Sequence, residues 1–170
     1  MHFRNGFHLH SGKEHYRLLI YMSLHFNGCD IFEIGTCGGV SALAFSSNPS
    51  NQVHTFDIVN VRSPELTDIS NIHFYIEDII EHPEHHEKLL SSPFIFYDTT
   101  HDGPLEKQFY DFLVNNNYKG ILLLDDIYYT DGIKMFWNHI QTPKIDITKY
   151  GHETGTGVVM FNNEINFKLE

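Results

Sequence analysis

Two short, strongly apolar segments separated by one helical segment constrain the fold of this chain most. Residues 93–97 read PFIFY and residues 120–124 read GILLL, and residues 105–115 between them carry apolar side chains at helical spacing. Apolar runs of this length fit strands that are buried on both faces, as in a parallel sheet. A strand, a helix and a strand in succession imply a right-handed crossover, with helices covering the sheet.

The same alternation extends along the rest of the chain. Further strands are expected at residues 30–34, 53–58, 72–76, 144–148 and 157–161. Further helices are expected at residues 13–26 with Ser11 as a cap, at 40–46, at 84–90, and at 131–140 with Thr130 or Asp131 as a cap. The last two strands are joined by the turn HETGTG without a helix, so they must form an antiparallel hairpin. The sequence therefore predicts a three-layer, doubly wound, Rossmann-like α/β sheet, mostly parallel with a C-terminal antiparallel hairpin.

Size and charge narrow the class of protein. The 170 residues fit one domain, 1–170, and the formal net charge of −11 argues against a nucleic-acid partner, because such binding depends on neutralising phosphates. No apolar run approaches the ~20 residues of a membrane helix, and the amino terminus lacks the apolar core of a signal peptide. Cys29 and Cys37 are too few for a disulfide framework, so we expect a cytoplasmic protein with neither a membrane nor a nucleic-acid partner.

A glycine-rich loop follows the first expected strand in the segment IFEIGTCGGVSALAF. Such a loop lets a ligand approach backbone amides and the start of the next helix. Asp57 ends the second expected strand, 22 residues after Gly35, where an acid can accept hydrogen bonds from a ribose. The dinucleotide fingerprint G-x-G-x-x-G fails at Cys37 and at Val40, which disfavours a nicotinamide cofactor. The alternative is a purely structural turn with a solvated Asp57.

The pattern Glu33-x-Gly35-x-x-x-Gly39-x-Ser41 resembles motif I of class I S-adenosylmethionine (AdoMet) dependent methyltransferases, in particular the catechol O-methyltransferase-like branch. The resemblance implies the class I methyltransferase fold. It also implies that the loop holds the amino-acid end of AdoMet, that Asp57 holds the ribose, and that the FYIED segment contacts adenine. The cofactor-binding residues implied in this way are Glu33, Gly35, Thr36, Gly39, Ser41, Asp57, Glu77, Asp78 and Asp98.

Three carboxylates follow the fourth and fifth expected strands. Asp98 ends FIFYD, and Asp125 and Asp126 end GILLLDD. Ligands bind outside the carboxyl ends of strands in such sheets, and neighbouring strands lie about 4.8 Å apart, so these side chains should converge. Converging carboxylates repel each other unless a hard divalent cation such as Mg²⁺ binds between them. The alternative is that Asp98 contacts AdoMet alone and that the acid pair forms a turn or caps a helix.

These strings also resemble metal-dependent O-methyltransferases and the small proteins called methyltransferase domain 24, over residues 30–162. The resemblance implies that Asp98, Asp125 and Asp126 bind the metal and that Asp98 and His101 are catalytic. His101 would remove the proton of the acceptor hydroxyl, which suits an unperturbed pKa near 6.5. Related sugar-modifying enzymes often have Asp-Gly-Asp where this chain has Asp98 followed by two threonines. This chain therefore lacks the second acid of those enzymes. A polar loop residue or a helix cap is the alternative for His101.

The predicted function is AdoMet-dependent methyl transfer by in-line displacement, with O-methylation of a hydroxylated small molecule or sugar and possible divalent-metal assistance. The main alternative is a non-catalytic subunit with an AdoMet-binding fold that serves in interaction or regulation. A homodimer in which the partner completes the acceptor pocket is compatible with both of these functions. The remaining histidines that we considered are expected to be solvated surface, with adventitious binding of a transition metal as the alternative: His8, His10, His82, His85 and His86. Tyr128 and Tyr129 could line an acceptor pocket, whereas Trp137 is expected in the core.

Overall fold

The computed structural model describes residues 13–64 and 68–162, so the expected cap Ser11 and the pair His8 and His10 lie outside the described residues. The strands are β1 (Asp30–Ile34), β2 (Gln52–Asp57), β3 (Ile72–Ile76), β4 (Phe94–Tyr97), β5 (Ile121–Asp125), β6 (Lys144–Asp146) and β7 (Thr156–Met160). The α-helices are α1 (Lys13–His25), α2 (Val40–Phe45), α3 (His86–Ser91), α4 (Pro104–Asn115) and α5 (Asp131–His139). Short 3₁₀ helices are η3 (Ile79–Glu81), η4 (Pro83–His85) and η5 (Thr148–Tyr150).

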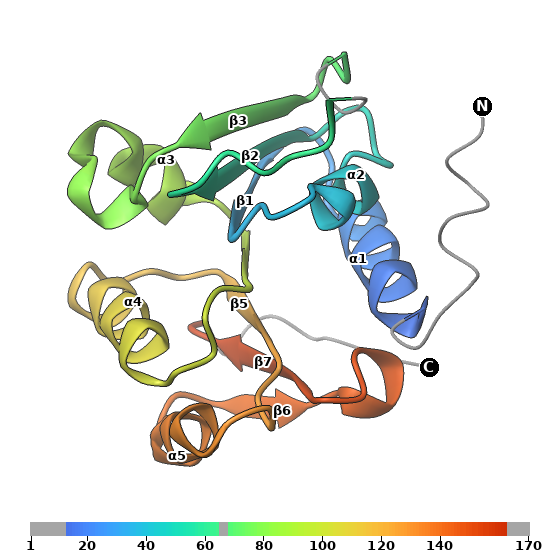
Figure 1. Cartoon of the computed structure of the whole chain (residues 1–170). Helices are drawn as coiled ribbons and strands as arrows, with labels where there is room; N and C mark the ends of the chain where they lie inside the picture. Colours follow the sequence, from blue (N-terminus) through green and yellow to red (C-terminus); the bar gives the residue numbers. More distant parts are fainter. Residues whose placement is uncertain (1–12, 65–67, 163–170) are drawn as a thin grey trace.

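The sheet has the order β3-β2-β1-β4-β5-β7-β6 (Figure 1). The pairs β1–β2, β2–β3, β1–β4 and β4–β5 are parallel, whereas β7 runs antiparallel to both β5 and β6. In the sheet, β2 and β3 lie on one side of β1, and β4 lies on the other side of β1. The carboxyl ends of β1 and β4 therefore form the switch point at which doubly wound sheets bind ligands.

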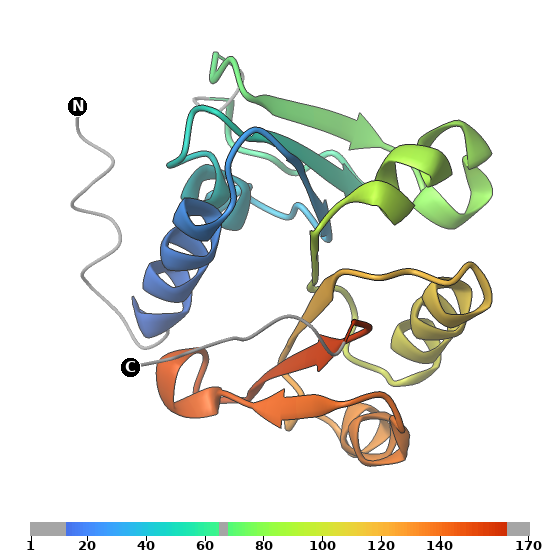
Figure 2. The same ribbon diagram turned by 180° about the vertical axis from the view of Figure 1, so that it is seen from behind.

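Helices cover both faces of the sheet, as the two opposite views show (Figures 1 and 2). On one face, α1 and α2 pack over a core that includes Phe94, Phe96 and Leu123. On the other face, α3, α4 and α5 pack over a core that includes Ile95 and Leu122. Neighbouring residues of β4 and β5 thus alternate between two buried faces, which explains why these strands are apolar at every position. The predicted three-layer architecture is confirmed.

Two elements differ from prediction by two residues at one end, each for a local reason, and the other boundaries agree within one residue. The expected helix 84–90 begins as the 3₁₀ turn η4, with Pro83 at its first position, and becomes α-helical only at His86. The expected strand 144–148 ends at Asp146, because Asp146 Oδ1 accepts hydrogen bonds from the backbone N–H and the hydroxyl of Thr148, at 2.9 and 2.5 Å. This local turn starts η5 and ends the pairing with β7.

Candidate functional site

The glycine loop after β1 passes very close to the end of β4. Gly35 has φ +103°, and a Cβ atom at this position would lie 1.6 Å from the backbone oxygen of Asp98. The backbone N–H of Gly35 donates to Phe56 O at 2.8 Å, which holds the loop against β2 as well. Gly39, with φ +81°, immediately precedes α2. Both predicted glycines therefore occupy positions at which a side chain would be strained, and at Gly35 it would also clash.

Asp57 fixes the loop from the end of β2. Its Oδ2 accepts the backbone N–H of Cys37 at 2.8 Å, and its Oδ1 accepts the backbone N–H of Val59 at 3.0 Å. The carboxylate is half-buried and faces a cavity, so each oxygen still has lone pairs available for a ligand hydroxyl. This geometry fits the predicted contact with a ribose.

A cavity of about 310 Å³ opens at the switch point between β1 and β4. Its polar lining includes Gly35, Asp57, Glu77, Asp78 and Asp98, all of which the sequence placed at a cofactor site. Its apolar lining consists of Ile34, Phe56, Ile58, Ile79, Tyr97 and Leu105. An apolar slot with a few converging polar groups fits a nucleoside better than a highly charged ligand.

Four of the predicted cofactor residues do not line this cavity: Glu33, Thr36, Gly39 and Ser41. Glu33 is fully buried beneath the loop, where Thr55 donates to its Oε2 at 2.5 Å. Burial raises the pKa of Glu33 to about 8, although hydrogen bonds from Ser41 and Thr55 oppose the shift. Its Oε1 has no hydrogen-bond partner among the residues that the structure describes, and the Thr36 and Thr55 hydroxyls hydrogen-bond to each other at 2.6 Å. These side chains form a polar layer under the loop.

The acid pair after β3 has protein partners as well. Asp78 Oδ1 accepts the backbone N–H of Ile80 at 3.0 Å and caps η3. Glu77 Oε2 lies 2.9 Å from His85 Nε2. The expectation that the histidines of this stretch are solvated surface is wrong for two of them. His85 and His86 are half-buried, His85 contacts Glu77, and His86 Nε2 lies 2.8 Å from Ile79 O. The chain turns back on itself through η3 and η4, which brings these side chains together.

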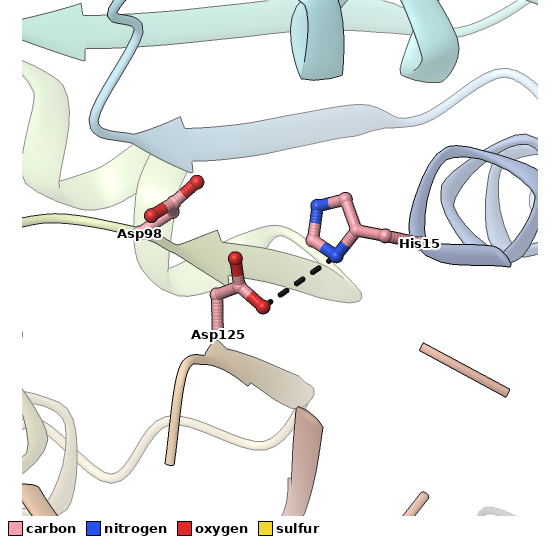
Figure 3. Close-up of side chains that lie close together, drawn as sticks. All are labelled: His15, Asp98 and Asp125. Carbon is pink, nitrogen blue, oxygen red and sulfur yellow. Dashed lines mark ion pairs between the residues drawn. The ribbon is translucent and has the colours of Figure 1, made fainter. Parts of the chain in front are cut away.

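Asp125 is the most deeply buried of the three predicted metal-binding acids. Figure 3 shows its carboxylate between Asp98 and His15, a residue of α1, with Asp125 Oδ1 3.5 Å from His15 Nδ1. Within the described part of the chain neither of these two atoms has a hydrogen-bond partner, and both side chains are more than nine-tenths buried. Burial, together with the charges of Asp98 and Asp126, raises the pKa of Asp125 to about 9. Burial lowers the pKa of His15 to about 4, so burial shifts the pKa of each group in the direction that favours its neutral form.

Asp126 is directed differently from its neighbour. It has φ +55°, and its Oδ1 lies 2.7 Å from His152 Nδ1 and accepts a hydrogen bond from the Thr154 hydroxyl. Side-chain atoms that could bind a metal ion, all within 4.8 Å of one another, form two groups at this edge. The first group is His15, Asp98 and Asp125, and the second is Asp125, Asp126 and His152. Among the described residues, no such group contains all three predicted carboxylates. The predicted acidic triad is thus two overlapping groups, each with a histidine.

His101 bridges the two outer carboxylates. Its Nε2 lies 3.2 Å from Asp98 Oδ1 and 3.4 Å from Asp126 Oδ2, and its backbone has φ +56°. Burial alone would lower the pKa of His101, but the hydrogen bond to Asp98 and the charges of Asp98 and Asp126 outweigh burial and raise it. The side chain does not cap the next helix, because Gly103 is the N-cap of α4. Left-handed backbone at His101 and Asp126 is the kind of strain that collects at functional sites.

Sequence reasoning missed His15 and His152. His15 lies three, four and seven residues before Leu18, Leu19 and Met22, all buried, so it belongs to the core-facing stripe of α1. His152 lies four residues before Thr156, which pairs with Asp125 in the antiparallel register of β5 and β7. Because an antiparallel strand begins where its neighbour ends, the predicted hairpin turn had to lie beside the acids.

A second and larger cavity, of about 1030 Å³, lies between α4 and α5. None of the residues predicted for the cofactor, the metal or the base lines it. The chemistry-bearing residues instead gather at the carboxyl ends of β1, β2, β4 and β5. No helix in the described part of the chain combines the length and apolar character needed to cross a membrane.

Several solved O-methyltransferases have a similar fold. The chain has the class I methyltransferase fold. The O-methyltransferase TomG from Streptomyces achromogenes, solved with SAM, is 16% identical with a TM-score of 0.63, over 87% of this chain and 79% of TomG. An O-methyltransferase from Bacillus cereus, solved with SAH, is 16% identical with a TM-score of 0.64, over 90% and 83%. A putative caffeoyl-CoA O-methyltransferase from Staphylococcus aureus is 14% identical with a TM-score of 0.64, over 85% and 81%.

No protein-family sequence model matches this chain, and no curated protein matches it in sequence. The fold expected from motif I and from the acid-terminated strands is thus confirmed at the level of structure.

Proposed function

We propose that this protein is an AdoMet-dependent O-methyltransferase that acts on a hydroxyl of a small molecule or sugar, with a divalent cation at the site. One observation carries the proposal: Asp98 both lines the nucleoside-sized cavity and belongs to the buried cluster of acids and histidines. A donor in the cavity and an acceptor at the cluster would therefore meet at the end of β4. The neighbouring folds solved with SAM or SAH support the choice of cofactor.

The chain's own residues account for binding of the donor. Asp57 would accept hydrogen bonds from the ribose, the loop at Gly35 would leave room for the methionine tail, and Ile58 and Ile79 would flank adenine. Glu33, together with Thr36 and Ser41, would support from beneath the loop that holds the amino-acid end. AdoMet supplies a methyl group that is already electrophilic, so the protein mainly needs to align donor and acceptor, which contributes up to about 7–11 kcal/mol in favourable cases.

The acidic edge fits a divalent cation. Asp125 Oδ1 is buried without a partner beside Asp98, and burying a polar group in this way costs about 1–3 kcal/mol unless a ligand satisfies it. Asp98, Asp125 and Asp126 would hold the ion. Mg²⁺ or a similar cation would orient the acceptor hydroxyl and lower its pKa.

His101 is suited to take the acceptor proton at Nε2. Its ring is held between Asp98 and Asp126, and the side chain is only 12% exposed, so its orientation is fixed. Asp98 would orient the imidazole and stabilise the imidazolium formed after proton transfer, as a carboxylate partner does for a catalytic histidine. Tyr129, whose ring centre lies 6.0 Å from that of His101, would border the acceptor.

Replacement of Asp125 tests the function. In the Asp125→Ala variant, turnover stimulated by the cation should be lost, whereas AdoMet affinity by calorimetry should stay within a few-fold. Asp131→Ala is the matched control, because this acid is 97% exposed at the start of α5. Turnover is followed by methyl transfer from labelled AdoMet to a panel of catechols, sugars and other hydroxylated metabolites. Full activity in Asp125→Ala, or in the presence of a chelator, would remove the cation from the proposal.

Thermal shifts test the cofactor itself. AdoMet and its demethylated product should raise the melting temperature, and NAD should not, because a ligand that binds only the folded state stabilises it by mass action. Stabilisation by NAD alone would contradict the assignment. Binding of AdoMet without turnover on any acceptor would favour the non-catalytic alternative.

A further inference from the structure

His15 carries an inference that rests on the proposed metal-dependent function and goes beyond it. The residue lies on α1, which covers the face of the sheet towards which Phe94, Phe96 and Leu123 point. Asp125 follows Leu123 by two residues and Asp98 follows Phe96 by two, so the strand alternation directs both carboxylates towards α1. The helix thus supplies a nitrogen atom to a site that is otherwise built from strand ends (Figure 3).

The imidazole of His15 is buried and its Nδ1 is unsatisfied. The residue is 5% exposed, and among residues 13–64 and 68–162 its Nδ1 has no hydrogen-bond partner, although it lies 3.5 Å from Asp125 Oδ1. The Asp125 oxygen is unsatisfied too. Two unsatisfied buried atoms that face each other, with Asp98 within the same 4.8 Å group, form a natural position for one shared cation.

Aromatic packing holds the ring in this orientation. The His15 ring centre lies 5.2 Å from that of Tyr16, 5.5 Å from that of Phe96 and 5.6 Å from that of His152. The contacts with Tyr16 and His152 are edge-on, at 84° and 72°. A ring fixed by its neighbours loses little conformational freedom when it binds a ligand, which is how a preorganised metal ligand behaves.

We propose that His15 is a direct metal ligand together with Asp98 and Asp125, so that the site selects a transition-metal ion such as Mn²⁺, Fe²⁺, Co²⁺ or Zn²⁺ over Mg²⁺. Mg²⁺ is bound in proteins by carboxylates, phosphates and water, whereas imidazole nitrogen suits the first-row transition metals. Asp126 would contribute less directly to metal binding, because its two oxygens already contact His101, His152 and Thr154. His152 would then orient Asp126 rather than bind the ion.

Metal binding to the metal-free full-length chain tests the proposal without measuring activity. Calorimetric titrations should show Mn²⁺ and Co²⁺ binding at least about tenfold more tightly than Mg²⁺. Pulsed EPR of the Mn²⁺-loaded protein should detect coupling to an imidazole ¹⁴N. The His15→Gln variant should lose that coupling and at least about tenfold of its Mn²⁺ affinity, while its weaker Mg²⁺ affinity changes little.

His25→Gln is the matched control, because His25 lies on the same helix, is exposed and bonds to Tyr21 O at 3.0 Å. It should keep both the coupling and the affinity. The wild-type spectrum gives a result even if the His15 variant fails to fold: bound Mn²⁺ without nitrogen coupling overturns the proposal. Coupling that survives in His15→Gln and disappears in His152→Gln overturns it as well, in favour of His152.

The experiment separates this inference from the proposed function. If Mg²⁺ binds as tightly as Mn²⁺ and methyl transfer still needs a cation, the nitrogen ligand is wrong and the metal-dependent methyltransferase stands. If no divalent ion binds and AdoMet still binds, both the nitrogen ligand and the metal are wrong while the cofactor assignment stands.

Discussion

The carboxyl edge of the sheet contains two regions that are built in opposite ways. The first region is the cavity at the switch point between β1 and β4, called the crevice below. There, both oxygens of Asp57 accept hydrogen bonds from backbone N–H groups, and the carboxylate stays open to solvent on one side. In the cluster at the ends of β4 and β5, the Asp125 carboxylate is buried and one of its oxygens has no partner. The Asp57 carboxylate is thus satisfied by backbone N–H groups, whereas Asp125 Oδ1 lacks a hydrogen-bond partner among the described residues. This difference supports the proposal that the first region binds the hydroxyl groups of a ribose and that the second binds a cation.

The two regions also differ in what determines their shape. Backbone geometry shapes the crevice, through positive φ at Gly35 and the contact of the loop with β4. Side chains from α1, β5 and the loops after β4 and before β7 shape the cluster. The comparison therefore predicts that changes to the backbone mainly weaken ligand binding in the crevice. Changes to side chains should mainly weaken ligand binding at the cluster.

The largest expected effect comes from Gly35→Ala. The added methyl group would meet the Asp98 backbone oxygen at 1.6 Å, at a φ that non-glycine residues rarely adopt, so the loop must move away from β4. We expect a loss of several kcal/mol in unfolding free energy and no measurable AdoMet binding, assayed by urea unfolding and calorimetry. Gly38→Ala is the control, since nothing lies within 4 Å of a Cβ at that position. If Gly35→Ala bound AdoMet normally, the loop could not be the methionine-tail site.

Glu33→Gln gives a smaller, pH-dependent effect. The folded protein holds the Glu33 proton with a pKa of about 8, raised by burial from 4.5. The folded state therefore binds this proton more tightly than the unfolded state, and the associated stability is complete below about pH 4.5 and is lost as pH rises through about 8. Relative to wild type, Glu33→Gln should become more stable by a few kcal/mol between pH 5 and pH 8, measured as unfolding free energies. A difference that does not change with pH would show that Glu33 is ionised when folded.

The smallest effect is expected far from both regions, at Lys144. Its ammonium donates to Trp137 O and, at 3.0 Å, to Ile140 O, and so satisfies carbonyl groups at the end of α5. Lys144→Met should cost about 1 kcal/mol of unfolding free energy and leave AdoMet and metal affinities unchanged. If either affinity fell more than a few-fold, α5 would be coupled to the site and the two-region comparison would be incomplete.

Most of the fold could be predicted from the sequence, because apolar residues at every position of segments such as 120–124 are compatible with few arrangements other than a covered parallel sheet. The crevice could be predicted for the same reason, since Gly35 and Asp57 directly follow or end strands. The cluster could be predicted only in part. Asp125 was placed by its strand, but His15 could not be placed, because the sequence does not fix where a helix crosses the edge of a sheet. His152 could have been found from the antiparallel pairing of the last strand.

The reversed direction of β7 has a consequence for how such a protein diversifies. Its leading turn, residues 151–155, lies beside the acids although it belongs to a hairpin at the far end of the chain. Under the proposed function, insertions or exchanges in this turn would reshape the acceptor side without altering β1 or β2, next to which the donor would bind. One strand that runs against its neighbours would thus let substrate choice evolve separately from cofactor choice.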